Sequence, residues 1–117
     1  SIVNDGKRYV MFLKDETREP AQKNIKVACA KKLTGPYSVP SDPITGNYWA
    51  EGPAALQVDK QWIVYFDKYT QHKYGAITST NLIDWSDVSD KISLPAGIRH
   101  GTIVKVTKDE YELLEKQ

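Results

Sequence analysis

The sequence has little cysteine, almost no net charge and no long apolar run. Cys29 is the only cysteine among 117 residues, which excludes an internal disulfide and a cysteine-rich metal site; we expect its side chain to be buried. The 16 basic and 15 acidic residues leave a net charge of +1, so no strong field attracts nucleic acid or an anionic membrane. No apolar run approaches the ~20 residues of a membrane span, and no leader-like segment opens the sequence. We therefore expect neither nucleic acid nor a membrane as a partner.

Most of the chain consists of short β-type runs separated by turn residues. Runs rich in β-branched and aromatic residues predict strands at 2–3, 8–13, 25–30, 53–58, 61–66, 74–78 and 102–106. Only residues 108–116 show helical spacing, and Thr107 is a plausible N-cap for them. The prediction is an all-β fold with a short C-terminal helix. Four aromatic residues in the middle of strands are expected in the core: Tyr9, Trp62, Tyr65 and Phe66.

The strand pattern repeats along the chain. Residues 5–12 resemble residues 58–65, and residues 27–33 resemble residues 76–82. A period of about 50 residues with several short strands is typical of a β-propeller blade. We therefore expect about two four-stranded antiparallel blades and part of a third: residues 1–45, 46–95, and 96–117 as the start of the next blade with the C-terminal tail. An open pair of blades leaves faces exposed, so further blades of the same protein or self-association should cover them.

Four short motifs follow one another in a characteristic order: LTGPY at 33–37, EGP at 51–53, STNL at 79–82 followed by Trp85, and RHGT at 99–102. In this order and spacing the sequence resembles glycoside hydrolase family 43. That family contains five-bladed propeller β-xylosidases, α-L-arabinofuranosidases and arabinanases. The resemblance runs along nearly the whole chain and corresponds to the later blades of the family's domain. It implies hydrolysis of glycosidic bonds in xylan- or arabinan-type plant polysaccharides.

The resemblance assigns Glu51 the role of general acid in an inverting mechanism. The innermost strands of a propeller begin at the axial funnel, where a carboxyl group near Tyr48 and Trp49 would have its charged form disfavoured and its proton retained. The alternative is that Glu51 is an exposed loop carboxylate.

Inverting hydrolysis also needs a second carboxylate as general base. The resemblance implies a base aspartate on the first blade and a tuning aspartate just before residue 1, and neither is among these residues. Asp15, Glu16 and Asp67 are the available substitutes, and we expect all three to be solvated or structural. The 117-residue chain is therefore expected to be a fragment that is inactive by itself.

The remaining candidate site residues are Tyr48, Trp49, Arg99 and His100. Tyr48 and Trp49 are candidates for stacking on a sugar face, and Arg99 for clamping sugar hydroxyls or pairing with an acid. The resemblance implies that His100 reaches the propeller axis and helps to hold a structural calcium ion, commonly through waters; the alternative is a hydrogen-bonded core histidine. No cofactor is required for the reaction.

Two other functions compete with a glycosidase. A non-catalytic carbohydrate-binding or interaction module would use Tyr48, Trp49 and Arg99 for contact. A mannoside phosphorylase on a similar propeller would need a basic cluster for phosphate, for which Arg99, His100 and Lys105 are the candidates. Since polysaccharide-degrading enzymes are usually exported, an extracellular or periplasmic location is weakly favoured.

Overall fold

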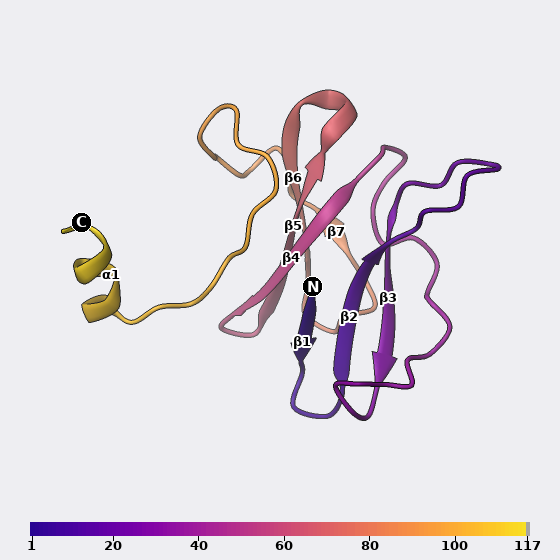
Figure 1. Ribbon diagram of the computed structural model, residues 1–117, viewed down its shortest axis with the longest axis horizontal. Coiled ribbons are helices and arrows are strands. Elements are labelled where there is room, and N and C mark those ends of the chain that lie inside the picture. Colours follow the sequence, from indigo (N-terminus) through magenta and orange to yellow (C-terminus); the bar gives the residue numbers. More distant parts are fainter. Residues whose placement is uncertain (117) are drawn as a thin grey trace.

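Two antiparallel sheets make up the body of the computed structural model, which describes residues 1–116 (Figure 1). The first sheet contains β1 (Ile2–Asn4), β2 (Tyr9–Lys14) and β3 (Ile25–Ala30) in that order. The second contains β4 (Glu51–Val58), β5 (Gln61–Lys68), β6 (Lys73–Ser79) and β7 (Ser86–Asp87). The predicted all-β class is confirmed, and the two sheets are consistent with partial propeller blades.

The sequence repeat corresponds to a structural repeat. In each sheet a strand joins the next through a tight turn, β1 to β2 and β4 to β5, and a third strand follows antiparallel to the second. Strand β3 has the predicted bounds, whereas β5 continues two residues beyond the prediction, to Lys68. That extension matters for function because it brings Asp67 into register with Glu51.

The first sheet has three strands, not the four that we predicted. The place beside β3 is taken by the irregular segment 38–44. Backbone N–H groups of Ser38 and Ser41 donate to the carbonyl oxygens of Cys29 and Val27, and the two serine hydroxyls accept from the N–H groups of those same residues. This segment satisfies the edge of the sheet without forming a ladder. Cys29 itself is half-buried, not buried as predicted.

The hydrophobic core joins residues of both sheets. Its buried members are Val10, Phe12, Ile25, Val27, Ala50, Trp62, Val64, Phe66, Ile77 and Leu82. The Phe12 ring contacts the Trp85 ring edge-on, with centroids 5.8 Å apart, which links the first sheet to the loop before β7. Trp62 and Phe66 are buried as predicted, but Tyr9 and Tyr65 are only half-buried. The cause is strand alternation, since they lie on the opposite faces from their buried neighbours.

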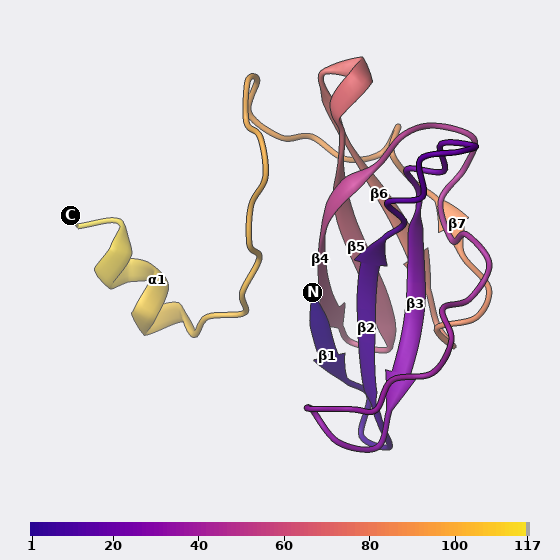
Figure 2. The same cartoon turned by 45° about the vertical axis from the view of Figure 1, so that its right-hand side comes forward.

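The predicted strand at 102–106 is wrong. The alternation of apolar residues is present, but no strand within residues 1–116 pairs with it, and Val104 and Val106 are exposed. Helix α1 (Lys108–Leu114) is confirmed, and Thr107 caps it: its hydroxyl accepts from the Glu110 N–H while the Glu110 carboxylate accepts from the Thr107 N–H. Both views show α1 apart from the sheets (Figures 1 and 2). None of the described helices is long and apolar enough to cross a membrane.

Candidate functional site

Two carboxylates lie side by side where β4 begins and β5 ends. Glu51 is the first residue of β4, and its register partner on β5 is Asp67. Residues directly opposite each other on antiparallel strands project from the same face of the sheet. Because a register shift follows between Glu51 and Ala54, the start of β4 departs from the regular ladder at this point.

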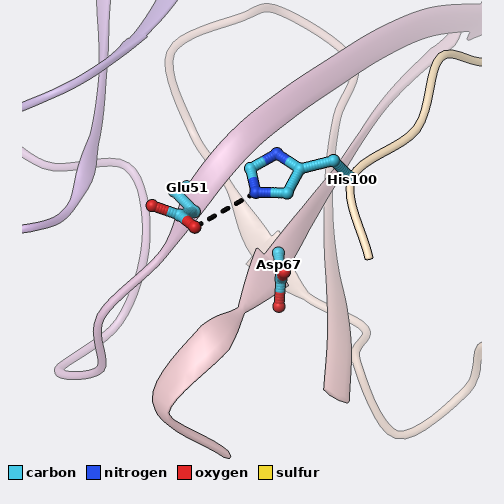
Figure 3. A group of neighbouring side chains, drawn as sticks. All are labelled: Glu51, Asp67 and His100. Carbon is cyan, nitrogen blue, oxygen red and sulfur yellow. Dashed lines mark hydrogen bonds and ion pairs between the residues drawn. The ribbon is translucent and has the colours of Figure 1, made fainter. Parts of the chain in front are cut away.

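The segment after the second sheet brings His100 to the same place. His100 Nε2 is in hydrogen-bond contact with Glu51 Oε1 at 3.1 Å, and Figure 3 shows the two side chains pointing toward each other beside Asp67. The imidazole ring also packs on Gly52, where a Cβ would lie only 2.7 Å from His100 Nδ1. Gly52 further has a φ of +59°, which disfavours other residues. The glycine after Glu51 therefore makes room for the histidine.

Lys14 holds Glu51 from the other sheet. Its ammonium group, at the end of β2, donates to Glu51 Oε2 at 2.7 Å and also pairs with Glu16 at 2.8 Å. The Lys14 hydrogen bond lowers the pKa of Glu51 below its usual value; partial burial opposes this effect, and His100 adds to it. The sequence predicts that the charged form of Glu51 is disfavoured, and the lowered pKa shows that this prediction is wrong. The aromatic neighbours were visible in the sequence, but the lysine 37 residues earlier was not.

Arg99 is held by a buried carboxylate. Its Nε donates to Asp67 Oδ2 at 2.5 Å, and its Nη2 lies 3.9 Å from Glu51 Oε1. The Asp67 side chain is 1% exposed, whereas that of Arg99 is 48% exposed, so the buried acid fixes one edge of a guanidinium that otherwise faces solvent. Asp67 Oδ1 is buried and has no hydrogen-bond partner among residues 1–116. Arg99 thus pairs with an acid while keeping its terminal nitrogens available near Glu51.

Tyr48 and Trp49, adjacent in sequence, lie in different surroundings. The Tyr48 ring stacks on Phe66 with centroids 5.9 Å apart, its hydroxyl donates to Asp87, and Lys68 Nζ lies 3.8 Å from the ring centroid. Burial, together with the contact to Asp87, raises the pKa of Tyr48. The structure therefore does not bring Tyr48 into the group around Glu51.

Trp49 is connected to Lys14 through the ring of Tyr69. It is 42% exposed, and its ring neighbours that of Tyr69, with centroids 6.0 Å apart. Lys14 Nζ lies over the Tyr69 ring, 4.9 Å from its centroid. Sequence reasoning missed both Tyr69 and Lys14. One signal was available for Lys14, because the internal repeat aligns it with Asp67, at the same end of the equivalent strand.

The three candidate substitutes for a general base are all ion-paired. Asp67 pairs with Arg99, Asp15 accepts from Lys26 at 2.8 Å, and Glu16 binds both Lys14 and a second lysine, Lys23. The hydrogen bond from Lys26 lowers the pKa of Asp15, and those from the two lysines lower the pKa of Glu16. Such carboxylates are held in structural ion pairs, so none of the three is positioned as a free base.

The calcium ion implied by the resemblance can be compared with the donors present. Glu51, Asp67 and His100 offer ligating atoms within 4.8 Å of one another. Calcium takes about six to eight oxygen ligands, whereas here Lys14 and His100 engage both oxygens of Glu51, and Arg99 engages one of Asp67. The positive charges of Lys14 and Arg99 already balance the negative charges of Glu51 and Asp67. These residues do not fit a directly bound calcium ion; an ion held through water stays a prediction.

A comparison with protein families identifies a match over nearly the whole chain. A family model for glycosyl hydrolase 43-related domains, described as a "probable glycosyl hydrolase domain", matches residues 1–112. No curated protein and no solved structure matches the chain.

Proposed function

The chain belongs to the family of glycosyl hydrolase 43-related domains, and from this premise we propose that it supplies the general acid for inverting hydrolysis of xylan- or arabinan-type glycosidic bonds. Glu51 is the proton donor in this proposal. The observation that carries it is the position of Glu51: a half-buried carboxylate at the start of β4, contacted by His100 on one oxygen and Lys14 on the other.

A general acid must hold a proton when the glycosidic oxygen departs. In the resting structure Lys14 favours the ionised form of Glu51, but Lys14 has a second partner in Glu16. A sugar entering beside Glu51 and displacing Lys14 toward Glu16 would remove that stabilisation and let Glu51 take up a proton. His100 Nε2, in contact with Oε1, would then orient the carboxyl group.

The sugar contacts that we propose are Arg99 and Trp49. The half-exposed guanidinium of Arg99 lies next to Glu51 and suits hydroxyl oxygens, and the exposed Trp49 ring suits the apolar face of a sugar. Tyr48, already packed against Phe66 and bonded to Asp87, is not used in this proposal.

In this proposal the general base comes from outside these 117 residues. The further blades that pack against the exposed faces of the two sheets also come from outside them. Support for this proposal comes from the ion pairs that engage Asp15, Glu16 and Asp67. The remaining blades could lie in the same protein or in another copy of the chain.

The test compares two substrates in a protein that contains the complete ring. Glu51→Gln keeps the shape of the side chain but removes the transferable proton. Hydrolysis of xylo- or arabino-oligosaccharides, whose leaving groups need that proton, should fall by roughly 10²–10⁴-fold. A dinitrophenyl glycoside, whose leaving group departs unaided, should be largely spared. Glu19→Gln, the same change at an exposed carboxylate, is the matched control and should leave both rates unchanged. Equal losses on both substrates would remove Glu51 from the acid role.

A carbohydrate-binding module remains the second candidate. It is favoured by the engagement of all three substitute carboxylates in ion pairs and by the exposure of Trp49. In that case Glu51→Gln would leave oligosaccharide binding unchanged, no hydrolysis would be found, and Trp49→Ala would weaken binding.

A further inference from the structure

We propose that Tyr69 and Trp49 together form an aromatic platform that receives the apolar C–H face of a neutral sugar next to Glu51. This inference deepens the proposed function and rests on it, because it names a further residue that contacts the substrate. The sequence indicates Tyr48, the chain neighbour of Trp49, as a candidate for stacking on a sugar, and gives no such indication for Tyr69.

Each ring of the platform lies on a segment that also carries a carboxylate of the site. Trp49 precedes Glu51 by two residues, and Tyr69 opens the short 3-10 turn that follows Asp67 and Lys68. Because β4 and β5 pair Glu51 with Asp67, the segments next to them are also brought together. The two rings meet with centroids 6.0 Å apart and planes tilted by 39°. Trp49 remains 42% exposed, so its ring can receive a ligand beside Tyr69.

Lys14 connects this platform to the acid. Its ammonium group lies 4.9 Å from the Tyr69 centroid and 2.7 Å from Glu51 Oε2. The ammonium group therefore lies over the Tyr69 ring, within cation–π distance, while it donates to the Glu51 carboxylate. A sugar stacked on Trp49 and Tyr69 would lie against the group that controls the ionisation of Glu51.

The chemistry of the surface selects its ligand. Aromatic faces offer apolar contact area with no full charge, which suits the C–H face of a pyranose or furanose. The Lys14 ammonium group can donate to a ring hydroxyl at the edge of the platform. Tyr48 cannot substitute for Tyr69, because its ring is stacked on Phe66 and its hydroxyl is bonded to Asp87.

The test measures binding without hydrolysis. Xylotetraose and arabinotetraose are titrated by calorimetry into the chain carrying Glu51→Gln, which removes the proposed proton donor and keeps the platform. In that background Tyr69→Ala and Trp49→Ala should each weaken binding by about 3- to 10-fold. Tyr69→Phe keeps the ring and should bind within about twofold. Tyr111→Ala, a tyrosine removed from the exposed face of α1, is the matched control and should change nothing.

Three outcomes would overturn the platform: a parent chain that binds neither oligosaccharide, an unchanged dissociation constant in Tyr69→Ala, or an equal loss in Tyr69→Phe. If Tyr69→Ala proves poorly folded by circular dichroism, Tyr69→Leu supplies the same comparison, since it keeps apolar bulk without the ring. The proposed acid role is judged separately by the leaving-group test. If the binding test fails while Glu51→Gln still slows the oligosaccharide and spares the dinitrophenyl glycoside, the platform is wrong and the acid role of Glu51 stands.

Discussion

Glu51 is surrounded by residues that lie far from it in the sequence. Lys14 comes from the first sheet, His100 from the segment after the second, and Arg99 approaches through its pair with Asp67. A carboxylate contacted by a lysine and a histidine is ionised at rest, so any acid role depends on a change in these contacts when a sugar enters.

The first prediction concerns Lys14→Met. Removing the ammonium group removes the main cause of the lowered pKa of Glu51, so that pKa should rise toward or above its usual value of 4.5. The measurement is an NMR titration of the Glu51 side-chain carboxyl carbon in both proteins. Lys7→Met, at an exposed turn, is the control and should leave the titration unchanged. An unaltered Glu51 titration in Lys14→Met would contradict the ion pair.

The same shift has a consequence for stability. A carboxyl group with a depressed pKa in the folded state stabilises the fold above its unfolded value, here 4.5, and this contribution is lost as pH falls through the folded pKa. Wild type should therefore lose stability in urea as pH drops below about 4.5, and Lys14→Met should lose less over that interval.

A second prediction at this scale compares Arg99→Ala with Asp67→Asn. Arg99→Ala removes the cation that pairs with the buried Asp67 carboxylate, whose Oδ1 has no hydrogen-bond partner among the described residues. Asp67→Asn instead removes the buried charge itself. We expect the larger drop in melting temperature for Arg99→Ala. The double substitution should cost less than the sum of the two single ones, because the partners act as a pair. Additive costs would show that the pair is not coupled.

At the scale of elements, the start of β4 and the segment carrying His100 depend on one glycine. Gly52 has a φ of +59°, and its open side is filled by the His100 ring. The loop therefore reaches Glu51 only because position 52 has no side chain. A local sequence motif, glutamate followed by glycine, thus serves a long-range contact.

The third prediction is Gly52→Ala. A Cβ would lie 2.7 Å from His100 Nδ1, so the imidazole must move away and the contact with Glu51 should be lost. The backbone conformation alone should cost about 1–2 kcal/mol. Gly6→Ala is a close control, since Gly6 also has a positive φ but no atom of the described part of the chain lies within 4 Å of its Cβ position. Both variants should show the backbone cost in urea unfolding, and only Gly52→Ala should shift the His100 ring signals. Unmoved His100 signals in Gly52→Ala would contradict the packing.

The equivalent strands of the two sheets also explain which aromatic residues are buried. In β2 the buried hydrophobic residues are Val10 and Phe12, and in β5 they are Trp62, Val64 and Phe66. The repeat aligns Tyr9 with Trp62, so the two strands bury opposite faces. The reason is that the two sheets stack with non-equivalent faces in contact. The face of the first sheet that packs on the second corresponds, in the repeat, to the outer face of the second sheet.

For the whole molecule, the proposed acid Glu51 is present, but each of the three candidate bases among the described residues is engaged in an ion pair. The fourth prediction is that the 117-residue chain alone hydrolyses aryl-xylosides and aryl-arabinosides no faster than buffer, because loss of one catalytic carboxylate commonly costs orders of magnitude in rate. The assay is release of the aryl group, with a Glu51→Gln chain as the control. Turnover that survives purification and disappears in Glu51→Gln would contradict the prediction and indicate a base within an assembled ring.

The sequence by itself determined the local elements. Period-two alternation with turn residues predicted six of the seven strands that the structure describes, and Thr107 is the N-cap of α1 as expected. These features depend on neighbours within a few residues, and such short-range preferences are encoded in composition and spacing. The repeat unit was visible for the same reason. The resemblance indicated Glu51 and His100 through short motifs, and the structure brings the two into contact.

Only the tertiary structure decided which side chains contact one another in the site. The pairing of Lys14 with Glu51 and of Asp67 with Arg99, and the replacement of Tyr48 by Tyr69 beside Trp49, depend on how sheets and loops pack. Residues 102–106 likewise depend on tertiary structure. Their alternating apolar residues would form a strand only where a neighbouring strand supplied hydrogen bonds. The sign of the Glu51 pKa shift followed from packing as well: a charge that reaches the site from 37 residues away outweighs the burial expected from its neighbours.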